Sequence, residues 1–299
     1  MILDHDRFIK SARSPFGNDH FDNIKGDLGM KKKFGLVMML VLIVVATAAA
    51  WAEASVKIFL GYSIGQTENK LNEEGAYAWE WTHTGIKHGP SLDVRYEGDS
   101  TPIFLRATLD YNILPDVKEE DINPDPLYYD GHDWSTELNI GYRVFKRGNF
   151  AITPYGGIGY LDWKLTCKTN SQLTEKYHTP YASAGAIFGY VEPRWSIALD
   201  VAVLLPFAGK YSYATTVHSN SFDEPVGMGA RIQLPITFSI IPKKDRAFGL
   251  MVFATPFYKY IDAGKSDNFN EAGGSGLIDK MERNTFSTFG IKAGVGVEF

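Results

Sequence analysis

The last part of the chain alternates between apolar and polar positions with very few breaks. Apolar residues hold one parity, namely Phe289, Ile291, Ala293, Val295, Val297 and Phe299, and glycines or charged residues hold most of the other. Successive side chains of a β-strand point to opposite faces, so this period of two predicts a strand over residues 285–299. A strand with one apolar face and one small or charged face fits a wall between lipid and a polar interior.

Nine earlier runs have a similar β-like pattern. Together the expected strands are residues 56–65, 86–97, 103–113, 134–145, 150–166, 180–191, 195–213, 226–241, 247–262 and 285–299. The connections alternate between long and short, and the long ones are residues 66–84, 114–133, 167–179, 214–224 and 263–284. Such segregation is typical of a transmembrane barrel with short periplasmic turns and long outer loops. The chain thus resembles a bacterial outer-membrane protein, and we predict an all-β, antiparallel up-and-down barrel of ten strands.

The amino-terminal region predicts export. Three lysines at 31–33 precede an apolar run over 34–45, and small residues follow, with A-x-A sites at 50–52 and 52–54. This order is that of a cleaved secretory signal peptide, which we assign to residues 30–52. A transmembrane helix over 34–52 is the alternative, because that length reaches the spanning range. The expected location is the outer membrane of a Gram-negative bacterium.

Residues 1–29 are polar and irregular, and they precede the expected signal peptide. A signal peptide is expected at the start of a protein, so we interpret Met30 as the true start or, alternatively, residues 1–29 as an unstructured extension. The barrel then occupies residues 53–299. That part keeps 23 basic residues (30 minus 7) and 30 acidic ones (35 minus 5), a net charge near −7. Such a charge argues against nucleic acid as a partner.

Alternation also predicts which charged residues face the lumen. Six basic and six acidic positions fall on inward faces: Arg95, Arg106, Arg143, Arg231, Lys259, Lys292, Asp93, Glu97, Asp110, Glu137, Asp200 and Glu298. A balanced set in a narrow ten-stranded barrel predicts ion pairs that fill the lumen, with a narrow, weakly conducting channel as the alternative. Aromatic residues near strand ends are expected to form interfacial girdles, namely Tyr155, Tyr160, Trp163, Tyr181, Tyr190, Trp195, Phe207, Tyr211, Tyr258 and Tyr260.

Several stretches are similar to those of a known family. They are residues 137–142 (ELNIGY), 159–166 (GYLDWKLT), Pro180-Tyr181 and 290–299. With ten strands and five long outer loops, the chain resembles the omptins, the outer-membrane endopeptidases. The resemblance implies an Asp pair on one wall facing an Asp-x-His pair on the other, with a water between them that attacks the peptide bond. A histidine oriented by a carboxylate can activate such a water.

The catalytic motif of that family is not intact in this chain. His218 lies where the histidine is expected, but Thr216 replaces the Asp two residues before it, and Asp223 is near at a different spacing. The opposite loop offers Asp130, His132 and Asp133, again without the family's spacing. These five residues are the catalytic candidates of an omptin-like peptidase. The alternative interpretation of His132 and His218 is that they are loop histidines in a polar setting without a catalytic role.

No cofactor or metal site is predicted. Acidic residues cluster over 116–133, but their spacing does not match a calcium loop, and Cys167 is the only cysteine. The expected partners are outer-membrane lipid, including contact with lipopolysaccharide, and an extracellular ligand or peptide bound at the outer loops. The first functional hypothesis is a structural or surface-interaction protein with a charge-filled lumen. An omptin-like aspartate/histidine endopeptidase and a narrow channel are the alternatives.

Overall fold

A computed structural model describes residues 54–74, 79–98, 102–120, 126–170, 173–214, 219–243, 248–264 and 280–299. The expected signal peptide, the extension before it and His218 lie outside the described residues. The strand segments are β1 (Ala54–Glu74), β2 (Trp79–Gly98), β3 (Ile103–Glu120), β4 (Leu127–Tyr142), β5 (Phe145–Arg147), β6 (Phe150–Cys167), β7 (Thr174–Val191), β8 (Trp195–Ala214), β9 (Ser219–Val226), β10 (Met228–Gln233), β11 (Ile236–Ile241), β12 (Gly249–Asp262) and β13 (Lys280–Glu298).

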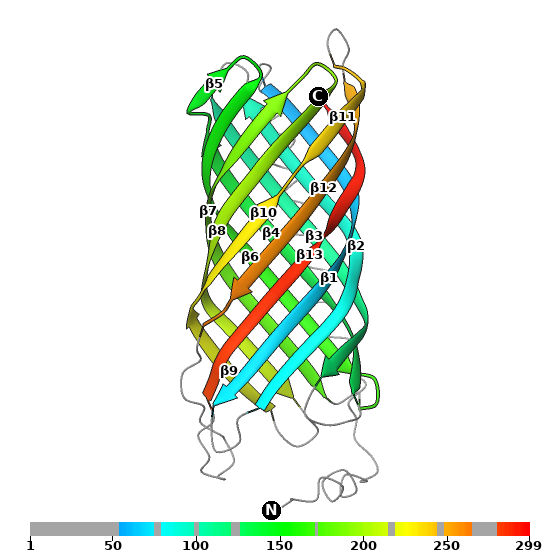
Figure 1. Cartoon of the computed structure of the whole chain (residues 1–299), viewed down its shortest axis with the longest axis vertical. Helices are drawn as coiled ribbons and strands as arrows, with labels where there is room; N and C mark the ends of the chain where they lie inside the picture. The colour runs from blue at the N-terminus through cyan, green and yellow to red at the C-terminus, as the bar shows by residue number, and fades with distance from the viewer. Residues whose placement is uncertain are drawn as a thin grey trace, which may run out of the picture. The chain divides into compact units, whose positions relative to one another are not determined.

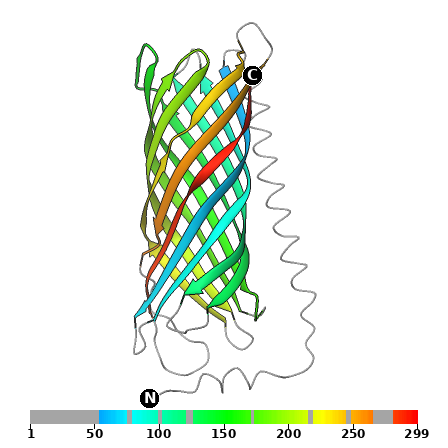
Figure 2. The same cartoon turned by 45° about the vertical axis from the view of Figure 1, so that its right-hand side comes forward.

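These segments form one closed antiparallel barrel (Figures 1 and 2). β5 continues β4, and β9, β10 and β11 are pieces of a single strand, so the thirteen segments make ten strands, as predicted. Pro235 separates β10 from β11, because proline has no amide hydrogen for the ladder. β13 pairs with both β1 and β12 and closes the wall.

The two faces of the wall are separated as the alternation predicted. In β4, Leu138 and Ile140 point outward with 51% and 62% of their surface exposed, whereas Glu137 and Asn139 point inward at 3% and 2%. A soluble protein buries its apolar side chains, whereas a barrel in lipid exposes them on its outer face and keeps polar side chains inside, as this wall does. Within the described residues there is no helix that is long and apolar enough to cross a membrane.

The strands are longer at their outer ends than the sequence predicted. Most of residues 66–84 and 114–133, expected as loops, continue the hairpins β1–β2 and β3–β4. The apolar alternation is lost there because outward positions such as Lys118, Lys164 and Lys176 are charged. A charged outward face does not suit the lipid band, so we place this part of the wall beyond the membrane.

Backbone irregularities change the faces of two strands. Asp116 in β3 and Ala208 in β8 have positive φ angles of 53° and 51°, and each lies where the pairing register shifts or the alternation of buried positions changes. Beyond Ala208 the odd-numbered residues of β8 turn inward, so Tyr211 is buried at 3%. Tyr155, Trp163 and Tyr181 also point inward by parity and are buried, which corrects their assignment to the girdles.

Other aromatic residues do lie on the outward face. Tyr190 and Trp195 contact each other near the turn between β7 and β8, with ring centroids 5.6 Å apart. Trp134 and Tyr160 contact each other at 5.1 Å on β4 and β6. From Trp134 to Tyr142, both included, β4 has nine residues, which is about the length a strand needs to cross the hydrocarbon core.

Candidate functional site

Arg106 of β3 anchors a network of charges across the lumen. Its Nη1 donates a hydrogen bond to Asp200 Oδ2 at 2.8 Å, and its Nη2 donates to Asp93 Oδ2 at 2.8 Å. Asp93 also accepts a hydrogen bond of 2.8 Å from Arg95. Arg106 is 6% exposed and Asp200 is 1% exposed. Buried charges are tolerated when they are paired and hydrogen-bonded, and these groups are both.

Arg231 of β10 extends the network to the opposite wall. Its Nη1 donates to Glu137 Oε2, and its Nη2 donates to the Tyr155 hydroxyl at 2.8 Å. Tyr155 in turn donates to Asp200 Oδ1 at 2.5 Å. Tyr181 donates to Glu137 at 3.1 Å. These bonds join strands from several sides of the barrel, so the charges fill the lumen at this level as predicted.

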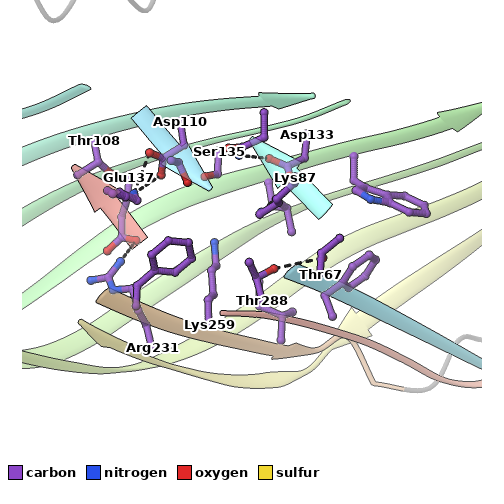
Figure 3. Close-up of a pocket in the computed structure, with 18 of the residues that line it drawn as sticks. Thr67, Lys87, Thr108, Asp110, Asp133, Ser135, Glu137, Arg231, Lys259 and Thr288 are labelled. Carbon is purple, nitrogen blue, oxygen red and sulfur yellow. Dashed lines mark hydrogen bonds and ion pairs between the residues drawn. The ribbon is translucent and has the colours of Figure 1, made fainter. Parts of the chain in front are cut away.

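Three lysines line a cavity beside this network (Figure 3). The cavity has a volume of about 70 Å³. Lys87 contacts Asp133 at 2.7 Å, and Lys292 contacts Asp110 at 2.6 Å. Lys259 lies over the ring of Tyr181, with Nζ 4.8 Å from the ring centroid. A cavity of this size has room for a few water molecules.

Toward the outer end, most of the buried side chains in the lumen are apolar or aromatic. Phe286 stacks on Tyr177 with centroids 4.3 Å apart and meets the edge of Trp163 at 5.7 Å. Leu114 and Leu165 are completely buried in the same cluster. The prediction of a charge-filled lumen is therefore correct for the ion network, whereas this outer part is packed mainly with apolar and aromatic side chains.

A second buried cluster lies at the same outer end and contains His83, Glu119 and Glu175. His83 Nε2 lies 3.4 Å from Glu119 Oε2 and 3.4 Å from Glu175 Oε1. Tyr129 donates a hydrogen bond to Glu119 Oε2, and Tyr211 donates to Glu175 Oε2 at 3.0 Å. All five side chains are buried. The cluster combines three groups that can bind a metal ion.

The candidate residues on β4 do not share one face. Asp133 points into the lumen, where it accepts hydrogen bonds from Lys87 at 2.7 Å and Asn112 at 2.6 Å. His132 points outward and stacks on Tyr111 at 6.0 Å. Asp130 also lies on the outward parity. The backbone of Asp223 pairs with Lys210 in β9 and β8, but its side chain and His218 lie outside the described part of the chain.

Asp130 belongs to a surface ion pair. Lys168, which follows the last residue of β6, contacts Asp130 at 3.0 Å and also contacts Asp116. Hydrogen bonds to Asp116 and Asp130 raise the pKa of Lys168. Exposed pairs of this kind contribute little to stability. The Asp130 carboxylate is thus engaged on the outer surface, away from the lumen-facing Asp133.

Sequence reasoning missed the cluster of His83, Glu119 and Glu175. Each residue lies in a stretch that the sequence predicted to be a loop, and the three are far apart along the chain. The extended hairpins place β2, β3 and β7 around one lumen and bring the side chains together. No local sequence spacing predicts that these three side chains come together, because their proximity depends on where the strands end and on the register shift in β3.

Comparisons with solved structures found other membrane barrels. The outer membrane protease OmpT from Escherichia coli matches with a TM-score of 0.59 and 8% sequence identity, over 83% of this chain and 96% of that chain. The translocator domain of the autotransporter NalP from Neisseria meningitidis covers 89% of this chain and 96% of that chain, with a TM-score of 0.37 and 10% identity. No protein-family model matches, and no curated protein matches. At these identities the likeness to OmpT concerns the fold alone. The chain is an outer-membrane β-barrel with a ten-stranded fold similar to that of the omptins.

Proposed function

We propose that this protein is a non-conducting outer-membrane barrel that acts at the cell surface as a structural or interaction protein. The observation that carries this proposal is the filling of the lumen over two consecutive levels. The ion network around Arg106 and Arg231 occupies one level, and the packed side chains around Trp163 and Phe286 occupy the next. These two levels narrow the lumen, so in this proposal the outer wall and its connections are the working surface.

The extended outer wall supports the same proposal. Its hairpins reach beyond the apolar band, and outward lysines replace the leucines and isoleucines found lower on the barrel. A wall that projects from the membrane offers a rigid base for loops that contact an extracellular ligand or peptide. Its lower, apolar part contacts outer-membrane lipid.

Conductance measurements test the non-conducting barrel. We expect refolded protein in planar lipid bilayers to give no steady current steps, while an open diffusion porin measured under the same conditions does. The folded state is checked by heat modifiability, the change in gel mobility on boiling. Reproducible steps from the heat-modifiable form that disappear after boiling would contradict the proposal and support the narrow channel.

A peptide-cleavage assay tests the other alternative. A dibasic fluorogenic peptide is incubated with the refolded protein in the presence of lipopolysaccharide, alongside His218→Ala. We expect no cleavage above a boiled control. Cleavage that His218→Ala abolishes would replace the interaction protein by an omptin-like endopeptidase.

A further inference from the structure

We propose that His83, Glu119 and Glu175 form a binding site for one divalent transition-metal ion, with Zn²⁺ as the best match. His83 comes from β2, Glu119 from β3 and Glu175 from β7. Their ligand atoms all lie within 4.8 Å of one another. The inference goes beyond the proposed function and does not depend on it, because it rests only on the geometry of these three side chains.

The distances from His83 to the two carboxylates fit the edges of a tetrahedral site. With bonds of about 2.0–2.2 Å from Zn²⁺ to nitrogen and oxygen, two ligands of a tetrahedron lie roughly 3.3–3.6 Å apart. His83 Nε2 lies 3.4 Å from both carboxylate oxygens, within that interval. A hydrogen bond from an imidazole nitrogen to a carboxylate is shorter, at about 2.7–2.9 Å. The two contacts of His83 are thus longer than an ordinary charged hydrogen bond and match the ligand spacing around a metal ion.

The polar atoms of His83 provide a second, independent observation. The side chain is 2% exposed, and among the described residues neither Nδ1 nor Nε2 makes a well-aligned hydrogen bond. Nε2 has only the two long contacts of 3.4 Å with the carboxylates. Buried nitrogen atoms without a partner are costly, and such sites commonly indicate an ion or a water that completes them. Nε2 faces the two carboxylates, so a metal ion there would satisfy it.

Charge supports a divalent ion. Two buried carboxylates face one imidazole, and neither carboxylate contacts a lysine or arginine in the ion pairs described. A protonated His83 would therefore leave one negative charge without compensation in a buried place, at a substantial cost. A divalent cation bound to a neutral imidazole and two carboxylates makes the group electrically neutral.

The surroundings hold the three ligands in place. The Tyr211 hydroxyl donates to Glu175 Oε2 at 3.0 Å and leaves Oε1 facing His83. The rings of Tyr129 and Trp163 pack edge-on to the imidazole, with centroids 5.2 Å and 6.0 Å away. Hydrogen bonds and packing of this kind orient ligands in known metal sites and tune their affinity.

The ligand set selects among metal ions. Calcium takes six to eight oxygen ligands and magnesium keeps several waters, so one nitrogen and two carboxylates suit neither. Imidazole with carboxylate suits zinc and neighbouring first-row ions. Because β7 is separated from β3 by β4 and β6 in the wall, the ion would tie two sides of the barrel together at its outer end.

Metal content and thermal stability test the site. Untagged protein is refolded, exposed to Zn²⁺ alone, dialysed and analysed for zinc, and its thermal unfolding is measured with and without Zn²⁺. The matched variants are Glu119→Gln, which removes a ligand, and Glu120→Gln, which removes the neighbouring exposed carboxylate on the opposite face. Heat modifiability checks that both variants fold.

We expect about one zinc per chain in the wild type and in Glu120→Gln, and a zinc-dependent rise in the unfolding temperature of both. Glu119→Gln should lose both effects. Tyr211→Phe should stay folded and bind zinc roughly 10–100-fold more weakly. Equal zinc content in the wild type and Glu119→Gln, or none in a folded wild type, would overturn the proposal and leave a buried imidazolium between two carboxylates.

Discussion

Arg231 shows how much of the closed lumen depends on single side chains. It is 6% exposed and is bound to Glu137 and to the Tyr155 hydroxyl, which itself donates to Asp200. A pair of this kind adds little compared with apolar packing of the same volume, but the loss of one partner is costly. Removing the guanidinium alone would leave Glu137 and Asp200 buried with too little positive charge.

We therefore predict that Arg231→Met destabilises the folded barrel by about 3–5 kcal/mol, the cost of breaking a buried ion pair. Denaturant unfolding in detergent micelles or lipid measures the free energy of unfolding. The double variant Arg231→Met/Glu137→Leu should recover much of that loss, since both charges are then absent. The exposed Arg147→Met serves as the control and should change stability by less than about 0.5 kcal/mol. If Arg231→Met were as stable as Arg147→Met, the ion network would not contribute measurably to the free energy of unfolding.

Neighbouring strands fit together through differences in side-chain size. Gly159 of β6 faces the lumen opposite Tyr181 of β7, and a Cβ atom at Gly159 would lie 2.3 Å from the tyrosine ring. Tyr181 is 1% exposed and donates a hydrogen bond to Glu137. The glycine thus makes room for the aromatic side chain that supports the ion network.

Gly159→Ala should cost about 1–3 kcal/mol of unfolding free energy, because the added methyl group displaces the Tyr181 ring and disturbs its hydrogen bond to Glu137. Gly189→Ala on β7 is the matched control, since no atom lies within 4 Å of the Cβ that it would add. Unfolding of the two variants under identical conditions gives the comparison. If Gly159→Ala were as stable as Gly189→Ala, the close fit between β6 and Tyr181 would not matter for stability.

How well the sequence predicts a strand changes along the length of that strand. Within the lipid band the contrast between Leu138 or Ile140 and Glu137 or Asn139 is strong, and there the alternation predicted both strands and faces. Beyond the band both faces are polar or mixed, so the pattern that indicates a strand disappears although the backbone pairing continues. The inward turn of Tyr211 depends on Ala208, whose positive φ of 51° is not visible in any spacing.

The predicted ten-stranded topology is a property of the entire barrel, and it followed from the alternation of short and long connections. The candidate site was much harder to predict, because its residues come together only when the sheet closes into a barrel. His83, Glu119 and Glu175 lie on strands that are not all neighbours, and their meeting depends on strand length, register and parity at once. The five catalytic candidates drawn from the omptin resemblance remain predictions.

The closure of the barrel by β13 can be tested by truncating the chain. β13 is paired on both sides, with β1 and with β12. A chain that ends at residue 279 would leave the edges of both neighbours without partners in the lipid band, where each unsatisfied backbone group costs several kcal/mol. We predict that this truncated chain forms no heat-modifiable barrel at all, rather than a barrel with nine strands. A chain that begins at residue 53 should fold like the full-length protein, because the described barrel begins at Ala54. Gel mobility before and after boiling, together with protease resistance in lipid, distinguishes the cases. A folded, protease-resistant product from the chain without β13 would mean that the remaining strands can close without it.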